Sequence, residues 1–172
     1  MGTAGDKAGR IEERQSVANN CLTKHFTGSE QSLDKLLCMV DQFGEALGLV
    51  PRDLFKIRLA LDELVTNILS YGCKETCPAN IFVRVCLDRD VLSIRLQDDA
   101  RPFNPLEAPS PELDLPLEER IKPIGGMGIH IVKGIMDSID YLRVEGKNQL
   151  TLTKKISQPT TKTASNNTRK SG

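Results

Sequence analysis

The sequence predicts an α+β fold: a two-layer sandwich in which a mostly antiparallel, mixed sheet carries helices on one face. Apolar residues recur at helical spacing in residues 29–47, 51–72 and 125–139, and they alternate with polar residues in 81–87 and 92–96. The order of elements is strand, two helices, two strands, loop, helix, two strands. This order favours helices packed on one face of a sheet.

The length of 172 residues predicts one domain with a core of ordinary size. Residues 1–9 are small and polar, and residues 157–172 are rich in Ser and Thr and lack large apolar side chains. Both ends are therefore expected to be disordered. The folded domain is predicted at residues 10–156, and no internal repeat is visible within it.

Composition disfavours several classes of partner. The 23 basic and 23 acidic side chains give a formal net charge of zero. The overall charge therefore does not favour binding to nucleic acid or to an anionic membrane. Aromatic residues make up only 4% of the chain and Trp is absent, which leaves little for stacking on single-stranded bases. The N-terminus lacks the apolar stretch of a signal peptide, and no apolar run approaches the roughly 18 residues of a membrane span. We expect a cytoplasmic protein that binds neither nucleic acid nor membrane.

The cysteines are predicted to be free thiols. They are odd in number and lie mostly in apolar periodic segments, where a free thiol acts as a small hydrophobe: Cys21, Cys38, Cys73, Cys77 and Cys86. This usage fits a reducing cytoplasm. Cys73 and Cys77 could form half of a zinc site, but their spacing is not Cys-x-x-Cys and no second ligand pair follows.

The N-terminal half is predicted to contain a weak strand at residues 14–23 and two helices. The first helix has Ser29 or Ser32 as its N-cap and ends at Gly48. Pro51 suits the first turn of the second helix, whose apolar stripe continues to near Gly72.

A β-hairpin is predicted next, with strands at 81–87 and 92–96 joined by residues 88–90. Side chains alternate between the two faces of a strand, so Asp98 is expected on the face of Leu92, Ile94 and Leu96, which is the core face. A carboxylate in that position needs a partner.

The C-terminal half begins with residues 99–123, which contain several prolines and acids without a period and predict a mobile lid or binding loop. Glycines before residue 129 then open a third helix, whose apolar stripe reaches Ile139. Two strands are expected at 141–144 and 150–156, around a turn at 146–148.

Glu63 and Asn67 are one helical turn apart, so both side chains leave the second helix on one face. The amide oxygen can join the oxygen shell of Mg²⁺, and the carboxylate can accept a proton from a water or hydroxyl nucleophile. Taken alone, the pair is better explained as solvated helix residues.

Asp98 and the glycines also allow two interpretations each. Asp98 could accept a hydrogen bond from the exocyclic amino group of adenine, or it could cap a turn before Pro102. Gly125, Gly126 and Gly128 could let phosphate approach the N–H groups at a helix start, or they could serve as the hinge of a lid.

The three motifs together resemble the anti-sigma factor serine/threonine kinases of the RsbW type, a branch of the histidine kinase-like ATPases with the Bergerat fold. The resemblance covers residues 12–156. Its motifs are residues 61–67, 98–105, 125–131 and 136–137, and they occur in the order and spacing of that family.

The resemblance implies roles for individual residues. Asn67 would hold Mg²⁺, Glu63 would act as general base, and Asp98 would bind the adenine amino group of ATP. The remaining residues implied to border the nucleotide are Ala100, Pro102, Phe103, Gly125, Gly126, Met127, Gly128 and Ile129, with Thr151 near the adenine.

The chain departs from the family pattern in two places. Ala100 stands where a glycine is usual, so its Cβ could crowd the backbone beside adenine and weaken binding. Tyr71 stands where a histidine is frequent. The sensor-kinase branch is disfavoured because no dimerisation helix pair with a phosphoacceptor histidine is present, and His25 and His130 are interpreted as structural.

Three functional hypotheses follow. In the first, the protein transfers the γ-phosphoryl group of ATP to a STAS-domain anti-anti-sigma protein. In the second, it is an ATP-gated switch that sequesters a sigma factor or other regulator with little or no kinase activity. In the third, the ATP site has decayed and the protein is a scaffold. The resemblance further implies a homodimer.

Overall fold

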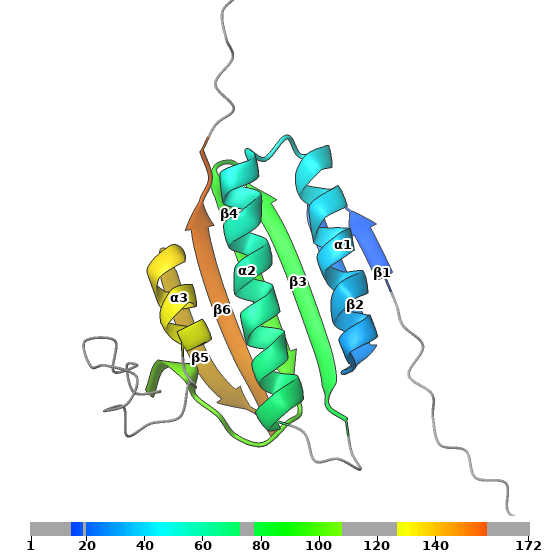
Figure 1. Ribbon diagram of the computed structural model, residues 1–172, viewed down its shortest axis with the longest axis vertical. Coiled ribbons are helices and arrows are strands. Elements are labelled where there is room, and N and C mark those ends of the chain that lie inside the picture. The colour runs from blue at the N-terminus through cyan, green and yellow to red at the C-terminus, as the bar shows by residue number, and fades with distance from the viewer. Residues whose placement is uncertain (1–14, 19, 73–77, 108–126, 158–172) are drawn as a thin grey trace, which may run out of the picture.

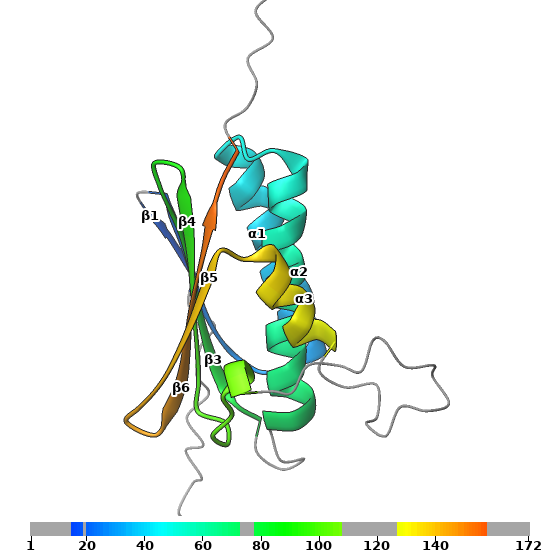
Figure 2. The same ribbon diagram turned by 90° about the vertical axis from the view of Figure 1, so that its left-hand side faces the viewer.

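The computed structural model describes residues 15–18, 20–72, 78–107 and 127–157 of the chain. Six strands form one sheet in the order β1-β2-β3-β4-β6-β5, and each described pairing is antiparallel. The described residues form three α-helices. These lie on one face of the sheet, as two perpendicular views show (Figures 1 and 2). The predicted two-layer α+β sandwich is confirmed, although the described sheet contains no parallel pair that would make it mixed.

The element bounds differ from the predicted ones mainly at the two hairpins. The strands are β1 (Gln15–Ala18), β2 (Cys21–Thr27), β3 (Asn80–Asp88), β4 (Val91–Asp98), β5 (Ser138–Val144) and β6 (Lys147–Lys155). The helices are α1 (Glu30–Ala46), α2 (Pro51–Asn67) and α3 (Met127–Ile135), with a π-helical turn η1 (Ile68–Gly72) and a 3₁₀ turn η2 (Pro105–Glu107). The weak strand predicted at 14–23 is two strands, and Asn148 lies inside β6 instead of in a turn.

The core lies between the helices and the inner face of the sheet. β3 and β4 contribute alternate residues that are almost fully buried: Ile81, Val83, Val85, Leu92, Ile94 and Leu96. The apolar stripes of α1 and α2 cover them, with Leu36, Ile57 and Leu61 at most 1% exposed. The alternating apolar residues of the strands and the apolar stripes of the helices therefore pack against each other, as the sequence predicts.

The helix ends follow local sequence signals. Ser29 is the N-cap of α1, and its Oγ accepts a hydrogen bond from the backbone N–H of Ser32 at 3.1 Å. Beyond the C-terminus of α1, Gly48 has a φ of +71°, a conformation that glycine adopts without a Cβ penalty. Pro51 occupies the first turn of α2, where a missing N–H costs nothing.

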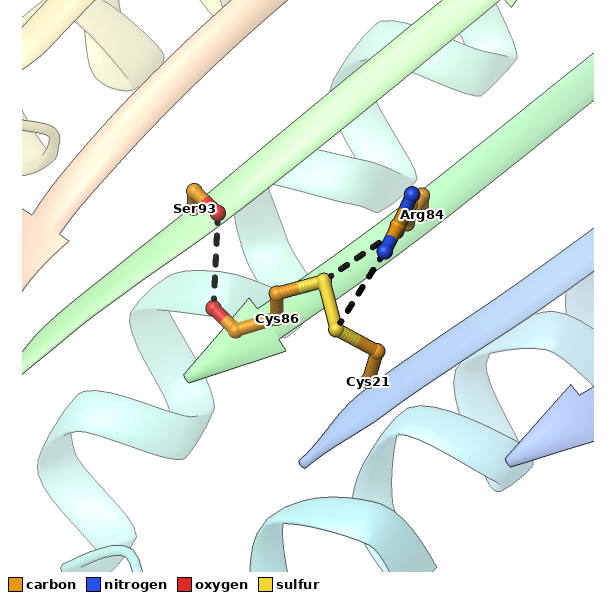
Figure 3. The surroundings of a disulfide bond; sticks show 4 residues. All are labelled: Cys21, Arg84, Cys86 and Ser93. Carbon is orange, nitrogen blue, oxygen red and sulfur yellow. Dashed lines mark hydrogen bonds between the residues drawn. A yellow bond between two sulfur atoms is a disulfide. The ribbon is translucent and has the colours of Figure 1, made fainter. Parts of the chain in front are cut away.

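Cys21 and Cys86 form a disulfide bond between β2 and β3, where they are direct partners in the strand register. Arg84 lies beside it and points Nε toward Sγ of Cys86 at 3.3 Å and Nη2 toward Sγ of Cys21 at 3.8 Å (Figure 3). The prediction of free thiols is therefore wrong for these two residues. Both occupy the sheet face away from the helices, outside the core where a thiol would act as a hydrophobe. Cysteine usage thus provides no argument for a reducing compartment.

Replacing Cys86 with serine is expected to lower the free energy of unfolding by about 2–4 kcal/mol in the absence of reductant. The bond joins residues 65 positions apart, so losing it restores much conformational freedom to the unfolded chain. Urea unfolding with and without dithiothreitol measures the effect. Cys38→Ser, which removes an exposed free thiol, is the matched control. Equal stability of C86S and wild type without reductant would contradict the pairing.

None of the described helices is long and apolar enough to cross a membrane. The predicted disordered ends and most of the predicted lid lie outside the described residues, as do Cys73 and Cys77. Of the proposed lid, the structure describes residues 99–107, which lead from β4 into η2.

Candidate nucleotide site

The C-terminal end of α2 carries Glu63 and Asn67 and then widens into the π-helical turn η1. Local π-helical turns are frequent at functional sites because they redirect side chains without ending the helix. Here the turn brings Tyr71 and Gly72 to the rim of a pocket that Asn67 also lines. Asn67 and Asp98, two of the predicted site residues, thus line one pocket.

Asp98, at the end of β4, points to the helix-covered face and is only 4% exposed. Its Oδ1 accepts two hydrogen bonds, from the backbone N–H of Ala100 at 3.0 Å and from Nδ2 of Asn148 at 2.8 Å. Asn148 lies directly opposite Asp98 in the register of β4 and β6. The buried carboxylate therefore has the partners that its position requires.

Burial raises the pKa of Asp98 above its ordinary value, while the hydrogen bonds from Asn148 and Ala100 oppose this effect. A carboxyl group with a raised pKa binds its proton more tightly in the folded than in the unfolded protein. Its stabilising contribution is therefore greatest in acid and is lost as pH rises through the folded pKa. Above that pKa, the buried ionised carboxylate lowers the free energy of unfolding. Such destabilising ionisable groups are typical of functional sites.

The pocket around Asp98 is mainly apolar and encloses about 260 Å³. That volume lies just below the ~300–1,000 Å³ range of pockets for whole ligands, so it suits a base more than a complete nucleotide. Tyr71 and Phe103 line it and are 60% and 49% exposed. Large exposed aromatic side chains of this kind can lie against the flat face of a base.

Glu63 packs directly against the glycine motif. A Cβ built on Gly128 would overlap Oε2 of Glu63 and would lie 2.8 Å from its Cδ. Only a glycine at position 128, in the first turn of α3, leaves room for the Glu63 carboxylate in this position. The structure therefore brings the first and third motifs into contact across the packing of α2 and α3.

Ala100 lines the pocket, and its methyl group lies against Gly72. A Cβ built on Gly72 would lie 2.9 Å from the Cβ of Ala100, so the Ala100 side chain occupies space that Gly72 leaves open. Ala100 is 9% exposed, and the next residue, Arg101, donates its backbone N–H to the carbonyl of Gly72 at 3.4 Å. The departure from the family pattern at Ala100 is thus accompanied by a glycine that accommodates it.

Replacing Gly72 with alanine is expected to destabilise the protein by about 1–3 kcal/mol, because two methyl groups would compete for one space. Adding Ala100→Gly to Gly72→Ala should restore most of that loss. Urea unfolding of the two single variants and the double variant forms a closed cycle that measures the coupling. Strictly additive effects would show that the two positions do not share this space.

The other predicted site residues fall in several places. Pro102 is exposed beside the pocket, and Met127 begins α3. Ile129 is 5% exposed and packs in the core, so its side chain is structural. Gly125 and Gly126 lie outside the described residues.

The expectation for Thr151 is corrected. Thr151 pairs with Arg95 in the strand register and lines a separate hollow on the other face of the sheet, together with Arg84 and Ser93. It lies three residues after Asn148, and an odd spacing along a strand reverses the face.

Sequence reasoning missed Asn148 and Arg143 as parts of the site. Asn148 is 5% exposed and lines the pocket, and Arg143 donates Nη1 to its Oδ1 at 2.6 Å and to the carbonyl oxygen of Ala100 at 3.1 Å. The alternation of Leu150 and Leu152 would have indicated that Asn148 faces inward, had β6 been predicted to begin at Lys147.

The chain matches the model of the histidine kinase-like ATPase domain over residues 26–154. This match spans most of the chain and includes the Glu63, Asp98 and Gly128 motifs. The protein therefore belongs to the family of histidine kinase-like ATPase domains, whose name identifies them as domains that act on ATP.

Two relatives narrow the assignment. The chain is 32% identical over 99 residues to the serine/threonine-protein kinase BtrW of Bordetella bronchiseptica, covering 58% of this chain and 68% of that protein. It also resembles the solved RsbU and RsbW domains of Rv1364c from Mycobacterium tuberculosis, with a TM-score of 0.55 and 16% identity over 80% of this chain. The match spans 33% of that solved chain, and this likeness shows the fold alone. The family match and the serine/threonine kinase relative confirm the predicted histidine kinase-like ATPase family, and the solved RsbW domain confirms the fold.

Proposed function

We propose that the protein is an ATP-dependent serine/threonine kinase that phosphorylates a STAS-domain anti-anti-sigma protein and acts as an anti-sigma regulatory factor. The observation that carries this proposal is the contact between Glu63 and Gly128, one helical turn before Asn67, which lines the pocket of Asp98. A candidate proton acceptor, a candidate phosphate-binding helix start and a candidate base-binding carboxylate are thereby grouped. The kinase name of the relative from Bordetella bronchiseptica supports the same reaction class.

We assign a distinct part in this mechanism to each of the candidate site residues that the structure describes. Asp98 accepts a hydrogen bond from the adenine amino group, and the side chains of Tyr71 and Phe103 flank the base. The N–H groups at the start of α3 face the phosphates, where the helix dipole favours negative charge. Glu63 accepts the proton of the substrate hydroxyl, so that the oxygen can attack the γ-phosphoryl group. Positioning and electrostatics supply most of the acceleration.

Asn67 is the candidate ligand for Mg²⁺, which neutralises phosphate charge in such reactions. Among the residues that the structure describes, no three His, Cys, Asp or Glu side chains form a metal cluster. The amide oxygen of Asn67 fits Mg²⁺, because this ion keeps several waters and takes its remaining oxygens from phosphates.

The partners are proposed on resemblance. A STAS-domain protein is the substrate, a sigma factor is a second binding partner, and two copies of the chain form a homodimer in the cytoplasm. Neither nucleic acid nor a membrane is required. Sequestration of one protein and phosphorylation of another are compatible in a single domain.

Two measurements test the proposal. Calorimetric titration with Mg-ATP and Mg-GTP should show selective ATP binding that Asn67→Ala removes. Incubation with γ-labelled ATP and a STAS-domain protein should then place the label on a serine or threonine of that protein. ATP binding without label transfer would favour the ATP-gated switch, and no binding at millimolar ATP would favour a scaffold.

A further inference from the structure

Asn148 is the centre of a hydrogen-bond network beside the base pocket. Its Oδ1 accepts three hydrogen bonds, from the backbone N–H of Phe103 at 3.3 Å, Oη of Tyr141 at 2.9 Å and Nη1 of Arg143 at 2.6 Å. Its Nδ2 donates two, to Oδ1 of Asp98 at 2.8 Å and to the carbonyl of Arg101 at 3.0 Å. Every hydrogen-bonding direction of this buried amide is occupied.

These partners fix which way the amide points. The guanidinium group of Arg143 and the backbone N–H of Phe103 can only donate, so they require the amide oxygen on their side. Reversing the amide would turn its NH₂ group toward these donors and its oxygen toward the Asp98 carboxylate. The network therefore holds an N–H of Asn148 against Asp98.

The fixed amide determines what Asp98 can recognise. Oδ1 is filled by Asn148 and Ala100, whereas the described residues supply no donor to Oδ2. Among the described residues, no side-chain oxygen is both sealed from solvent and without a hydrogen-bond partner. Oδ2 is therefore not sealed, and because Asp98 lines the pocket, this oxygen opens onto it. A carboxylate held in this way accepts hydrogen bonds and donates none.

We propose that Asn148, held by Arg143, is the positioning residue that keeps Asp98 an acceptor and thereby sets the preference for adenine over guanine. This inference rests on the proposed ATP site. Adenine presents an amino donor at the position where guanine presents a carbonyl acceptor. The acceptor Oδ2 can pair with the amino group of adenine. With guanine, it would face the carbonyl oxygen, which is a second acceptor.

The charges around Asp98 determine how its ionisation responds to pH. Asp99 lies next to it and raises its pKa, and Arg143 on β5 lowers it. Besides Asn148, the polar side chains that line the pocket with it are those of Asn67 on α2, Tyr71 on η1 and exposed Arg101. Because ATP binding requires ionised Asp98, affinity falls as pH drops through its pKa. Losing the Asn148 donor moves that fall to higher pH.

The test is a pH series of calorimetric titrations with Mg-ATP and Mg-GTP on wild type, Asn148→Leu and Arg143→Met. Asn148→Leu is expected to raise the pH midpoint of ATP binding by about one unit or more, which is roughly a tenfold loss at a pH below the midpoint. GTP affinity should fall less, so the ATP-to-GTP ratio shrinks. Arg143→Met should act in the same direction with a smaller effect. Carboxyl ¹³C NMR of the nucleotide-free variants should show a raised pKa of Asp98.

Matched controls come from the other face of the sheet. Gln149→Leu and Arg95→Met remove an amide and a guanidinium group that bond to each other at 2.6 Å away from the pocket, and both should keep the wild-type pH profile. Equal weakening of ATP and GTP at every pH would indicate a merely structural role and overturn the inference. If Asn148→Leu does not fold, Arg143→Met decides the test. An unchanged pH profile of ATP binding and an unchanged pKa of Asp98 in Arg143→Met would overturn the inference. Wild type that binds neither nucleotide would instead overturn the proposed function itself.

Discussion

Replacing Glu63 with glutamine is expected to lower phosphoryl transfer by about 10²–10⁴-fold while leaving the affinity for ATP near that of wild type. Glutamine keeps the size of the side chain and its contact with Gly128 but is not a proton acceptor. ATP binding depends on Asp98 and the aromatic rim, which the substitution does not touch. Single-turnover transfer from γ-labelled ATP to a STAS-domain protein measures the rate, and calorimetry measures the affinity.

The control for this experiment is Asp62→Asn, which neutralises the neighbouring carboxylate on the same helix. It should transfer phosphate at close to the wild-type rate, because consecutive helical residues face different directions. Wild-type transfer by Glu63→Gln would remove Glu63 as the base. A loss of ATP binding in the same variant would assign it a role in holding the nucleotide.

Replacing Gly128 with alanine is expected to lower transfer by at least about 10²-fold with little change in stability. The new Cβ would occupy the position of the Glu63 carboxylate, which must swing away. The end of a flexible side chain moves at low cost to folding, but a displacement of about 1 Å is sufficient to cost 10²-fold in rate. The same labelled transfer and a urea unfolding curve give the two readouts.

Gly134→Ala provides the matched control in the same helix. A Cβ at Gly134 has no neighbour within 4 Å, so this variant changes helix propensity alone and should keep wild-type transfer. If Gly128→Ala transfers phosphate normally, then the Glu63 carboxylate does not act from the position seen here. If it unfolds, the contact is primarily structural.

Much of the site could be predicted from sequence because its signals are local. The inward direction of Asp98 follows from the alternation of β4, and the shared face of Glu63 and Asn67 follows from helical spacing. What local patterns do not contain is pairing between distant strands. The family resemblance implies Thr151 near the adenine, and only the register of β6 against β4 shows that Thr151 lies on the other face of the sheet.

The same reason explains the disulfide bond. Cys21 and Cys86 are each in a strand with apolar neighbours, and both were interpreted as core thiols. Only the register of β2 against β3 shows that they are direct neighbours on the outer face. Asn148 was missed for a related reason: its role depends on contacts with Asp98 and Arg143, which become visible only when three strands are aligned.

The strand order has a consequence for how the protein acquires its function. β6, the last strand described, inserts between β4 and β5, so β5 contacts the rest of the sheet only through it. The side-chain amide that donates a hydrogen bond to Asp98 belongs to Asn148, which lies 50 residues further along the chain. During synthesis, the pocket is therefore incomplete until the β5-β6 hairpin has emerged and docked. Such long-range pairing is slow compared with local helix formation, so the pocket around Asp98 is completed late in folding.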